Sequence, residues 1–291
     1  MKIGFIGAGK VGFSLGKFFA EGGIPVTGYY SRHRESAQEA AAFTGTRGYE
    51  SLEDLVGESD ALFVTVPDGA IASVYEQLKQ YEITGKQICH CSGAMTAAEA
   101  FFDVAEHGAL GYSIHPLFPI SSKYETYREL AGAFFCLEGG NTSAEQEGLH
   151  RWQSRLESLG CAVRSIDGSA KVRYHAACAI ASNLVCGLMQ ERVELLRTCG
   201  FSEQEGLMAL APLIRSNVEH VLEVGPIKAL TGPMERCDTT TVAKHLDCFL
   251  QESDRSMYAA VSKKLLTMAE EKHPDRDYSN MHAIFQRDIA E

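Results

Sequence analysis

The sequence predicts an α/β fold, a doubly wound parallel sheet, followed by an all-helical C-terminal domain. Strand-like and helix-like segments alternate up to residue 166, a spacing typical of parallel strands joined by helices on both faces of the sheet. Beyond residue 168 only helix-like segments follow. A chain of 291 residues is long for a single core and natural for two domains. We therefore expect one domain over residues 1–167 and a second over residues 168–291.

The strands are predicted from short apolar runs. The continuous apolar run at residues 61–66 is expected of a strand that is buried on both faces of a parallel sheet. By the same reasoning, strands are expected at residues 2–6, 26–30, 87–91, 109–114, 133–137 and 161–166.

Helices are expected between these strands, at residues 11–21, 35–43, 68–80 and 143–159. Asp68 is placed to cap the third helix, and the segment from Ser143 to Gln146 resembles a capping box at the start of the fourth. This part of the chain therefore has the helices that a doubly wound sheet requires.

The C-terminal part is predicted to be helical throughout. One long helix is expected over residues 171–199, and its first half is apolar nearly all round, which predicts burial on every side. Ser202 and Glu205 form a capping box for a helix that runs to about residue 223. Asp238 is placed to cap a helix from about residue 239, and a last helix is expected from about residue 254.

The composition favours a soluble, cytoplasmic protein with a small-molecule partner. The formal charge of -11 argues against nucleic acid and anionic membrane surfaces as partners. The longest apolar stretch, residues 176–189, is shorter than a membrane span, and the opening strand leaves no room for a signal peptide. Nine cysteines without a CxxC pair are expected to be free thiols in a reducing compartment. On a strand His90 points away from Cys89 and Cys91, so no metal site is expected.

A glycine-rich loop follows the first strand and opens the first helix. Its sequence fits G-x-G-x-x-G, with Gly7 for the tight turn, Gly9 for close approach of a pyrophosphate, and Gly12 for helix–strand packing. The helix N-terminus offers free N–H groups to phosphates. A turn without a ligand is the alternative. We predict a Rossmann domain whose dinucleotide contacts Gly7, Ala8, Gly9, Lys10, Val11 and Gly12.

The end of the second strand favours NADP(H) as the cofactor. NAD-binding domains usually carry Asp or Glu there to hold the ribose 2′-hydroxyl, whereas this chain has no acid before Glu35. Ser31, Arg32 and Arg34 stand there instead, and guanidinium groups bind a 2′-phosphate that a carboxylate would repel. Alternatively, the two arginines are solvated loop charges.

Several later motifs occur in the same order as in a known group of proteins. They include Val66-Pro67-Asp68, Ser92-Gly93, the segment around His115, the segment from Lys171 to His175, and the loop around Thr231. The whole chain resembles the Rossmann-like NADP-oxidoreductase, or deazaflavin-dependent-reductase-like, proteins, whose helical C-terminal domain has no known function. More distantly it is similar to 6-phosphogluconate and 3-hydroxyisobutyrate dehydrogenases, ketopantoate reductase and prephenate dehydrogenase.

The resemblance implies a substrate cleft between the domains, hydride transfer to or from nicotinamide, and a homodimer built on the helical domains. It also places Val66, Pro67 and Asp68 near the cofactor. In the hydroxyacid dehydrogenases a lysine at the position of Lys171 assists proton transfer, although those enzymes tend to carry asparagine where this chain has His175.

Three residues are candidates for catalysis. Lys171 and His175 are four residues apart and share a helix face, so both can reach one ligand. His115 is expected in a loop at the C-terminal end of a strand, where ligands bind in open α/β sheets, and a histidine with a pKa near neutrality can relay a proton. The alternatives are a solvated lysine and structural histidines. Expected substrate contacts are Ser92, Gly93, Asn183 and Thr231.

The sequence therefore predicts an NADP-dependent oxidoreductase for a small, polar metabolite. The alternative is a dinucleotide-binding sensor or scaffold that performs no reaction, and a third possibility is a deazaflavin-linked reductase. The chain contains no G-x-S-x-G, Walker A or H-E-x-x-H motif, which argues against hydrolase, NTPase and zincin functions.

Overall fold

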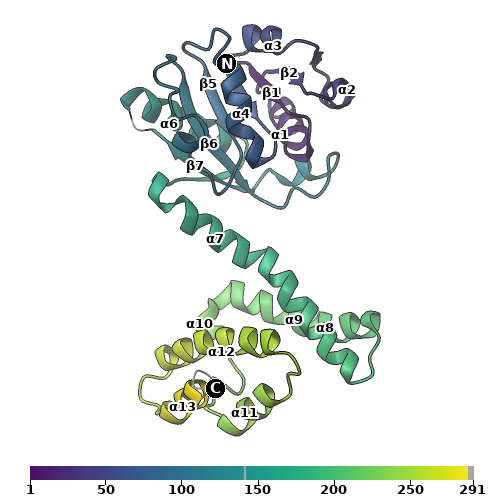
Figure 1. Ribbon diagram of the computed structural model, residues 1–291, viewed down its shortest axis with the longest axis vertical. Coiled ribbons are helices and arrows are strands. Elements are labelled where there is room, and N and C mark those ends of the chain that lie inside the picture. Colours follow the sequence, from purple (N-terminus) through teal and green to yellow (C-terminus); the bar gives the residue numbers. More distant parts are fainter. Residues whose placement is uncertain (141, 288–291) are drawn as a thin grey trace. The chain divides into compact units, whose positions relative to one another are not determined.

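The computed structural model describes residues 1–140 and 142–287 (Figure 1). The chain divides into two compact units, Met1–Ser182 and Asn183–Glu291. The first unit holds the sheet and also helix α7 (Lys171–Ala181), which follows the last strand. The boundary predicted after residue 167 stays a prediction.

The first unit is built on one eight-stranded sheet in the order β3-β2-β1-β4-β5-β6-β7-β8. Its strands are β1 (Ile3–Ile6), β2 (Val26–Tyr30), β3 (Arg47–Tyr49), β4 (Ala61–Val64), β5 (Gln87–His90), β6 (Leu110–Leu117), β7 (Phe134–Gly139) and β8 (Ala162–Ser165). The prediction of a doubly wound α/β sheet is confirmed.

One pairing departs from the wholly parallel sheet that the sequence predicts, because β6 and β7 run antiparallel. The segment between them contains a short 3-10 turn, η1 (Thr126–Glu129), and, among its described residues, no α-helix of the kind that usually connects parallel strands. The sheet is therefore mostly parallel, with a reversal at β6.

Helices cover the sheet on both faces and give it two cores. They are α1 (Lys10–Glu21), α2 (Arg34–Thr44), α3 (Leu52–Glu58), α4 (Asp68–Leu78), α5 (Ala97–Ala100) and α6 (Ser143–Ser158). Alternate residues of β4 serve different cores: Phe63 packs with Phe19 and Trp152, whereas Leu62 packs on the side of Tyr75. The apolar run in β4 is continuous because each face of this strand is covered.

Two predicted helix caps in this unit are wrong. Pro67 is the N-cap of α4, and Asp68 is the first helical residue, which caps nothing with its side chain. The capping box of α6 is formed by Thr142 and Glu145, one residue before the predicted pair that starts at Ser143. The extended residue Thr142 precedes the helix, so its hydroxyl and not that of Ser143 reaches the free N–H groups.

The second unit is helical throughout its described residues. It contains α8 (Asn183–Thr198), α9 (Glu203–Val224), α10 (Pro226–Ala229), α11 (Thr239–Asp247), α12 (Glu252–Lys272) and α13 (Ser279–Arg287). The predicted caps of α9, by Ser202 and Glu205, and of α11, by Asp238, are confirmed. Its core includes Val242 and Met281. Within residues 1–140 and 142–287, no helix is long and apolar enough to cross a membrane.

The predicted long helix over residues 171–199 is interrupted at Ser182, between α7 and α8. The Ser182 hydroxyl donates to the Cys178 carbonyl oxygen, 2.7 Å away, a bond to the preceding turn that bends helices. The expected burial on every side of the first half is also wrong within this chain, since Val172 is 71% and Ile180 61% exposed. An apolar composition predicts that a helix needs a partner, but does not say that the same chain provides it.

Candidate functional site

The glycine loop connects β1 to α1 in a shape that two of its glycines make possible. Gly7 has a φ of +104°, and a Cβ there would lie 2.7 Å from the Thr65 carbonyl oxygen. A Cβ on Gly12 would lie 2.6 Å from the Gly7 carbonyl oxygen. A Cβ on Gly9 would meet nothing within 4 Å, so the space beside this residue is open. The fold thus requires the first and third glycines, and the second leaves room for a ligand.

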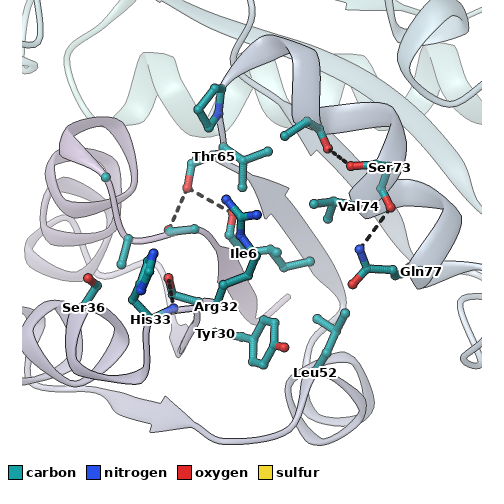
Figure 2. Close-up of a pocket in the computed structure, with 17 residues that line it drawn as sticks. Ile6, Tyr30, Arg32, His33, Ser36, Leu52, Thr65, Ser73, Val74 and Gln77 are labelled. Atoms are coloured by element: carbon teal, nitrogen blue, oxygen red, sulfur yellow. Dashed lines mark hydrogen bonds between the residues drawn. The ribbon is translucent and has the colours of Figure 1, made fainter.

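The loop borders a cavity of about 270 Å³ (Figure 2). Figure 2 shows Arg32 and His33, which follow β2, on one side of the cavity, and Val74 and Gln77 of α4 on the other. The predicted cofactor residues that line it are Gly7, Ala8, Gly9, Ser31, Arg32, Val66 and Pro67. None of the described residues that line it is Asp or Glu.

The other predicted cofactor residues lie outside this lining. Arg34 begins α2, and its guanidinium is ion-paired with the exposed Glu50 carboxylate. Lys10 is exposed and Val11 packs against the core. Gly12 lets α1 pack closely against the loop, and the Asp68 carboxylate accepts a hydrogen bond from Ser92 outside the cavity. Sequence reasoning missed ten further residues of the lining, because several of them come from α3 and α4, where no motif marks them. They are Ile6, Tyr30, His33, Ser36, Leu52, Thr65, Ala70, Ser73, Val74 and Gln77.

A second group of polar residues lies within the first unit, beyond the C-terminal end of β5. Ser92 Oγ donates to Asp68 Oδ2 over 2.7 Å. A Cβ on Gly93 would lie 2.6 Å from His175 Cδ2 and 2.9 Å from His115 Nε2. The His115 and His175 ring centroids are 6.4 Å apart. The structure therefore brings the predicted residues Ser92, Gly93, His115 and His175 together. Together with Lys171 and Ser113, which are described next, we call them the polar cluster.

Lys171 is the buried cation of the polar cluster. Its side chain is fully buried, and its ammonium donates to Ser113 Oγ, which in turn donates to the Ser92 carbonyl oxygen over 3.2 Å. Burial lowers the pKa of Lys171, and the nearby Glu138 carboxylate opposes that shift. Sequence reasoning missed Ser113, because a serine inside a strand carries no signal of its own.

His115 lies inside β6, where the sequence predicted a loop. Pro116 is tolerated in this strand because β5 pairs with β6 only as far as Ser113, so its missing N–H breaks no bond on that side. His115 Nδ1 lies 2.7 Å from Tyr174 Oη. Burial and the charges of Lys171 and His175 lower the pKa of His115 to about 4, below the expected near-neutral range. At neutral pH this imidazole is therefore uncharged.

The last two predicted substrate contacts belong to the second unit. Asn183 is the first residue of α8 and is exposed, and it follows the interruption at Ser182 instead of continuing the helix of Lys171. Thr231 lies in the loop between α10 and α11 and lines a cavity of that unit. Their part in substrate binding stays a prediction.

Two family models match separate parts of the chain. Residues 1–116 match a Rossmann-like domain, and residues 133–265 match a domain of unknown function, DUF2520. No curated protein sequence matches the chain.

Solved structures resemble the chain over nearly its whole length. Protein TM1727 from Thermotoga maritima has 24% identity and a TM-score of 0.72, and the match covers 93% of this chain and 99% of that one. BF3122 from Bacteroides fragilis, which is described as a candidate NADP oxidoreductase, has 22% identity and a TM-score of 0.67 over 91% of this chain and 98% of that one. The imine reductase from Myxococcus stipitatus, solved with NADP+, has 16% identity and a TM-score of 0.62 over 99% and 100%. At these identities the likeness shows the fold.

Proposed function

We propose that this protein is a cytoplasmic NADP(H)-dependent oxidoreductase that acts on a small metabolite. The observation that carries the proposal is the lining of the cavity beside the glycine loop, which offers Ser31 and Arg32 and, among the described residues, no carboxylate. A guanidinium and a hydroxyl bind a 2′-phosphate, whereas a carboxylate would repel it. BF3122 is described as a candidate NADP oxidoreductase and the imine reductase was solved with NADP+, which supports the same choice of cofactor.

The residues of the glycine loop fit a dinucleotide. The open space beside Gly9 admits a pyrophosphate close to the backbone, and the N-terminus of α1 supplies unpaired N–H groups. Thr65 Oγ1 donates to the Gly7 carbonyl oxygen over 2.9 Å and so holds the loop against β4. When bound, the nicotinamide supplies or accepts the hydride.

In this proposal the polar cluster moves the proton that accompanies the hydride. His115 Nδ1 is engaged by Tyr174, so Nε2 is the atom that exchanges a proton with the substrate. The half-buried His175 is placed to bind a substrate oxygen. The Ser92 hydroxyl donates to Asp68 and accepts from the Ala94 and Met95 N–H groups, so it shapes the wall of the site and holds the loop after β5 in place. Lys171 is fully buried and acts through Ser113 and through its charge, which adds to burial in lowering the pKa of His115.

The cofactor assignment is tested by fluorescence titration with NADPH and NADH. We expect wild type to prefer NADPH, and Arg32→Gln to weaken NADPH binding by about 10- to 100-fold, the value of a lost charge-assisted hydrogen bond, while NADH binding is unchanged. Arg34→Gln is the matched control, because this arginine is paired with Glu50 outside the cavity. Equal affinity of wild type for both nucleotides, or equal losses in both variants, would contradict the assignment.

The second candidate function is a dinucleotide-binding sensor that performs no reaction. The complete burial of Lys171 favours it, since a buried lysine cannot contact a substrate directly. A metabolite screen at the nicotinamide absorbance band separates the two functions. For the enzyme we expect a substrate whose turnover is abolished in His175→Ala while NADPH affinity is kept. The possibility that a deazaflavin donates or accepts the hydride rests on the family resemblance alone. Adding a deazaflavin to the same metabolite screen tests that possibility.

We also propose that the protein is a homodimer through the helices that follow the sheet, at residues 168–291. The exposed apolar side chains of α7, Val172 and Ile180, support this, since a helix of this composition needs a cover. Light scattering after size exclusion should give twice the chain mass of 31.8 kDa, and Ile180→Glu should lower it to one chain mass. A monomeric wild type would contradict the proposal.

A further inference from the structure

The second unit contains a cavity of its own, between α8, α11, α12 and the loop that holds Thr231. Its volume is about 560 Å³, within the range of sites for small molecules. Most of its wall is apolar and includes Leu188, Leu195, Met234, Phe249, Val261 and Leu265. Such a lining with a few polar groups is typical of a ligand pocket.

Arg192 of α8 is the cation in the wall of this cavity. It is half-buried, and its Nε donates to the Leu188 carbonyl oxygen over 2.9 Å. Its Nη2 contacts the Met189 sulfur, and within residues 1–140 and 142–287 it forms no ion pair with a carboxylate. Burial lowers the pKa of Arg192. A partly desolvated guanidinium that has no carboxylate partner among the described residues is suited to receive an anion.

The other polar groups in the wall limit which anion fits. Glu191 lines the same cavity, and burial together with the neighbouring Asp254 raises the pKa of its carboxyl group. His245 Nδ1 and Tyr258 Oη lie 2.8 Å apart and bond to each other. One guanidinium beside an acidic residue favours a single negative charge over a phosphate dianion, which needs more donors.

We propose that this cavity binds a small apolar monocarboxylate, with its carboxylate on Arg192 and its hydrocarbon part against the apolar wall. The planar guanidinium presents parallel N–H groups that match the two oxygens of a carboxylate. The apolar wall contributes affinity for the tail by removing it from water. This site stands independently of the proposed oxidoreductase function.

The test measures binding of octanoate and octanol to the full chain by calorimetry. The two probes share a tail and differ in charge, so we expect saturable octanoate binding and at least about tenfold weaker octanol binding, the factor for a modest charge-assisted hydrogen bond. Arg192→Gln should weaken octanoate binding by a similar factor, and Arg192→Lys, which keeps the charge, should weaken it less. Arg197→Gln is the matched control, because Arg197 lies on the same helix, is exposed and does not line the cavity.

Three results would overturn the proposal. Octanol could bind as tightly as octanoate, Arg192→Gln could bind octanoate like wild type, or binding could fail to saturate at millimolar octanoate. The third result is the one expected if a second copy of the chain fills the cavity. Circular dichroism melting establishes that each variant is folded. NADPH titration of the same samples keeps the two proposals apart, since loss of octanoate binding with intact NADPH binding bears on this cavity alone.

Discussion

His90 is predicted to make the first unit sensitive to acid. It ends β5, is fully buried, and accepts a hydrogen bond at Nδ1 from the Ser92 N–H over 3.1 Å. A hydrogen bond between the ring and the Thr96 backbone opposes the lowering of its pKa. Burial, followed by the charge of Lys171, lowers the pKa of His90 from 6.5 to about 3. The folded protein therefore holds this imidazole neutral at pH values where the unfolded chain binds a proton.

The pKa values fix the sign and size of the effect. Between pH 6.5 and pH 3 the unfolded state binds more protons than the folded state, so the free energy of unfolding falls as the pH falls. Each unit costs about 1.4 kcal/mol, so by about pH 4 the loss from this residue is about 3 kcal/mol. Since a domain has only about 5–15 kcal/mol of stability in total, this is a large share.

The substitution His90→Asn removes the titrating group and keeps an acceptor, the amide oxygen, within reach of the Ser92 N–H. We expect the variant to lose about 3 kcal/mol less than wild type between about pH 7 and pH 4, whatever its stability at neutral pH. Urea unfolding followed by tryptophan fluorescence measures this. The single tryptophan, Trp152, is 1% exposed in the core of the first unit and reports on that unit.

The exposed His150, on the same helix as the tryptophan, provides the control variant His150→Asn, which should follow the wild-type pH dependence. If His90→Asn and wild type lose the same free energy on acidification, the reasoning from a buried neutral His90 is refuted.

Three further predictions concern the sites of the first unit. Lys171→Met should raise the pKa of His115 from about 4 toward 6.5, because the lysine charge is, after burial, the largest cause of the lowered pKa. NMR titration of the His115 ring protons measures this pKa. An unchanged pKa in the variant would show that the lysine charge is not a cause. Gly9→Ala should keep the melting temperature but weaken NADPH binding by more than about tenfold, since its Cβ enters only the open space. Gly7→Ala should weaken NADPH binding and also lower the free energy of unfolding by about 2 kcal/mol. The reason is that Gly7 has a positive φ and that an added Cβ would collide with the Thr65 backbone. Equal stability of both alanine variants would show that Gly7 is not needed for the fold.

Most strands of the sheet could be predicted because burial on both faces leaves a local apolar run, as at Ala61–Val64. The strand β3 was missed, since only Tyr49 of its three residues is buried. The seven-residue helix α3 was missed as well. The strand β7 was predicted at residues 133–137, but its antiparallel direction was not, because an apolar run marks a strand and carries no information on its direction.

The parts of the candidate site that are formed by consecutive residues could be predicted from the sequence. The glycine loop and the Ser31–Arg32 turn are each continuous in sequence, and both line the cavity. The opposite wall, with Val74 and Gln77, comes from a helix without a motif. Ser113 has meaning only through Lys171, 58 residues away, so no pattern along the chain identifies it.

The turn after β4 connects the cavity with the polar cluster. Val66 and Pro67 line the cavity, and the next residue, Asp68, accepts the hydrogen bond of Ser92. Strands β1 and β4 are neighbours in the sheet while the chain proceeds outward from them in opposite directions, and ligands of open α/β sheets bind at such a switch point. An extended dinucleotide whose 2′-phosphate lies at Arg32 would cross the glycine loop and pass this turn before it reached Ser92. The order of these residues across the sheet therefore agrees with the order in which the proposed cofactor would contact them.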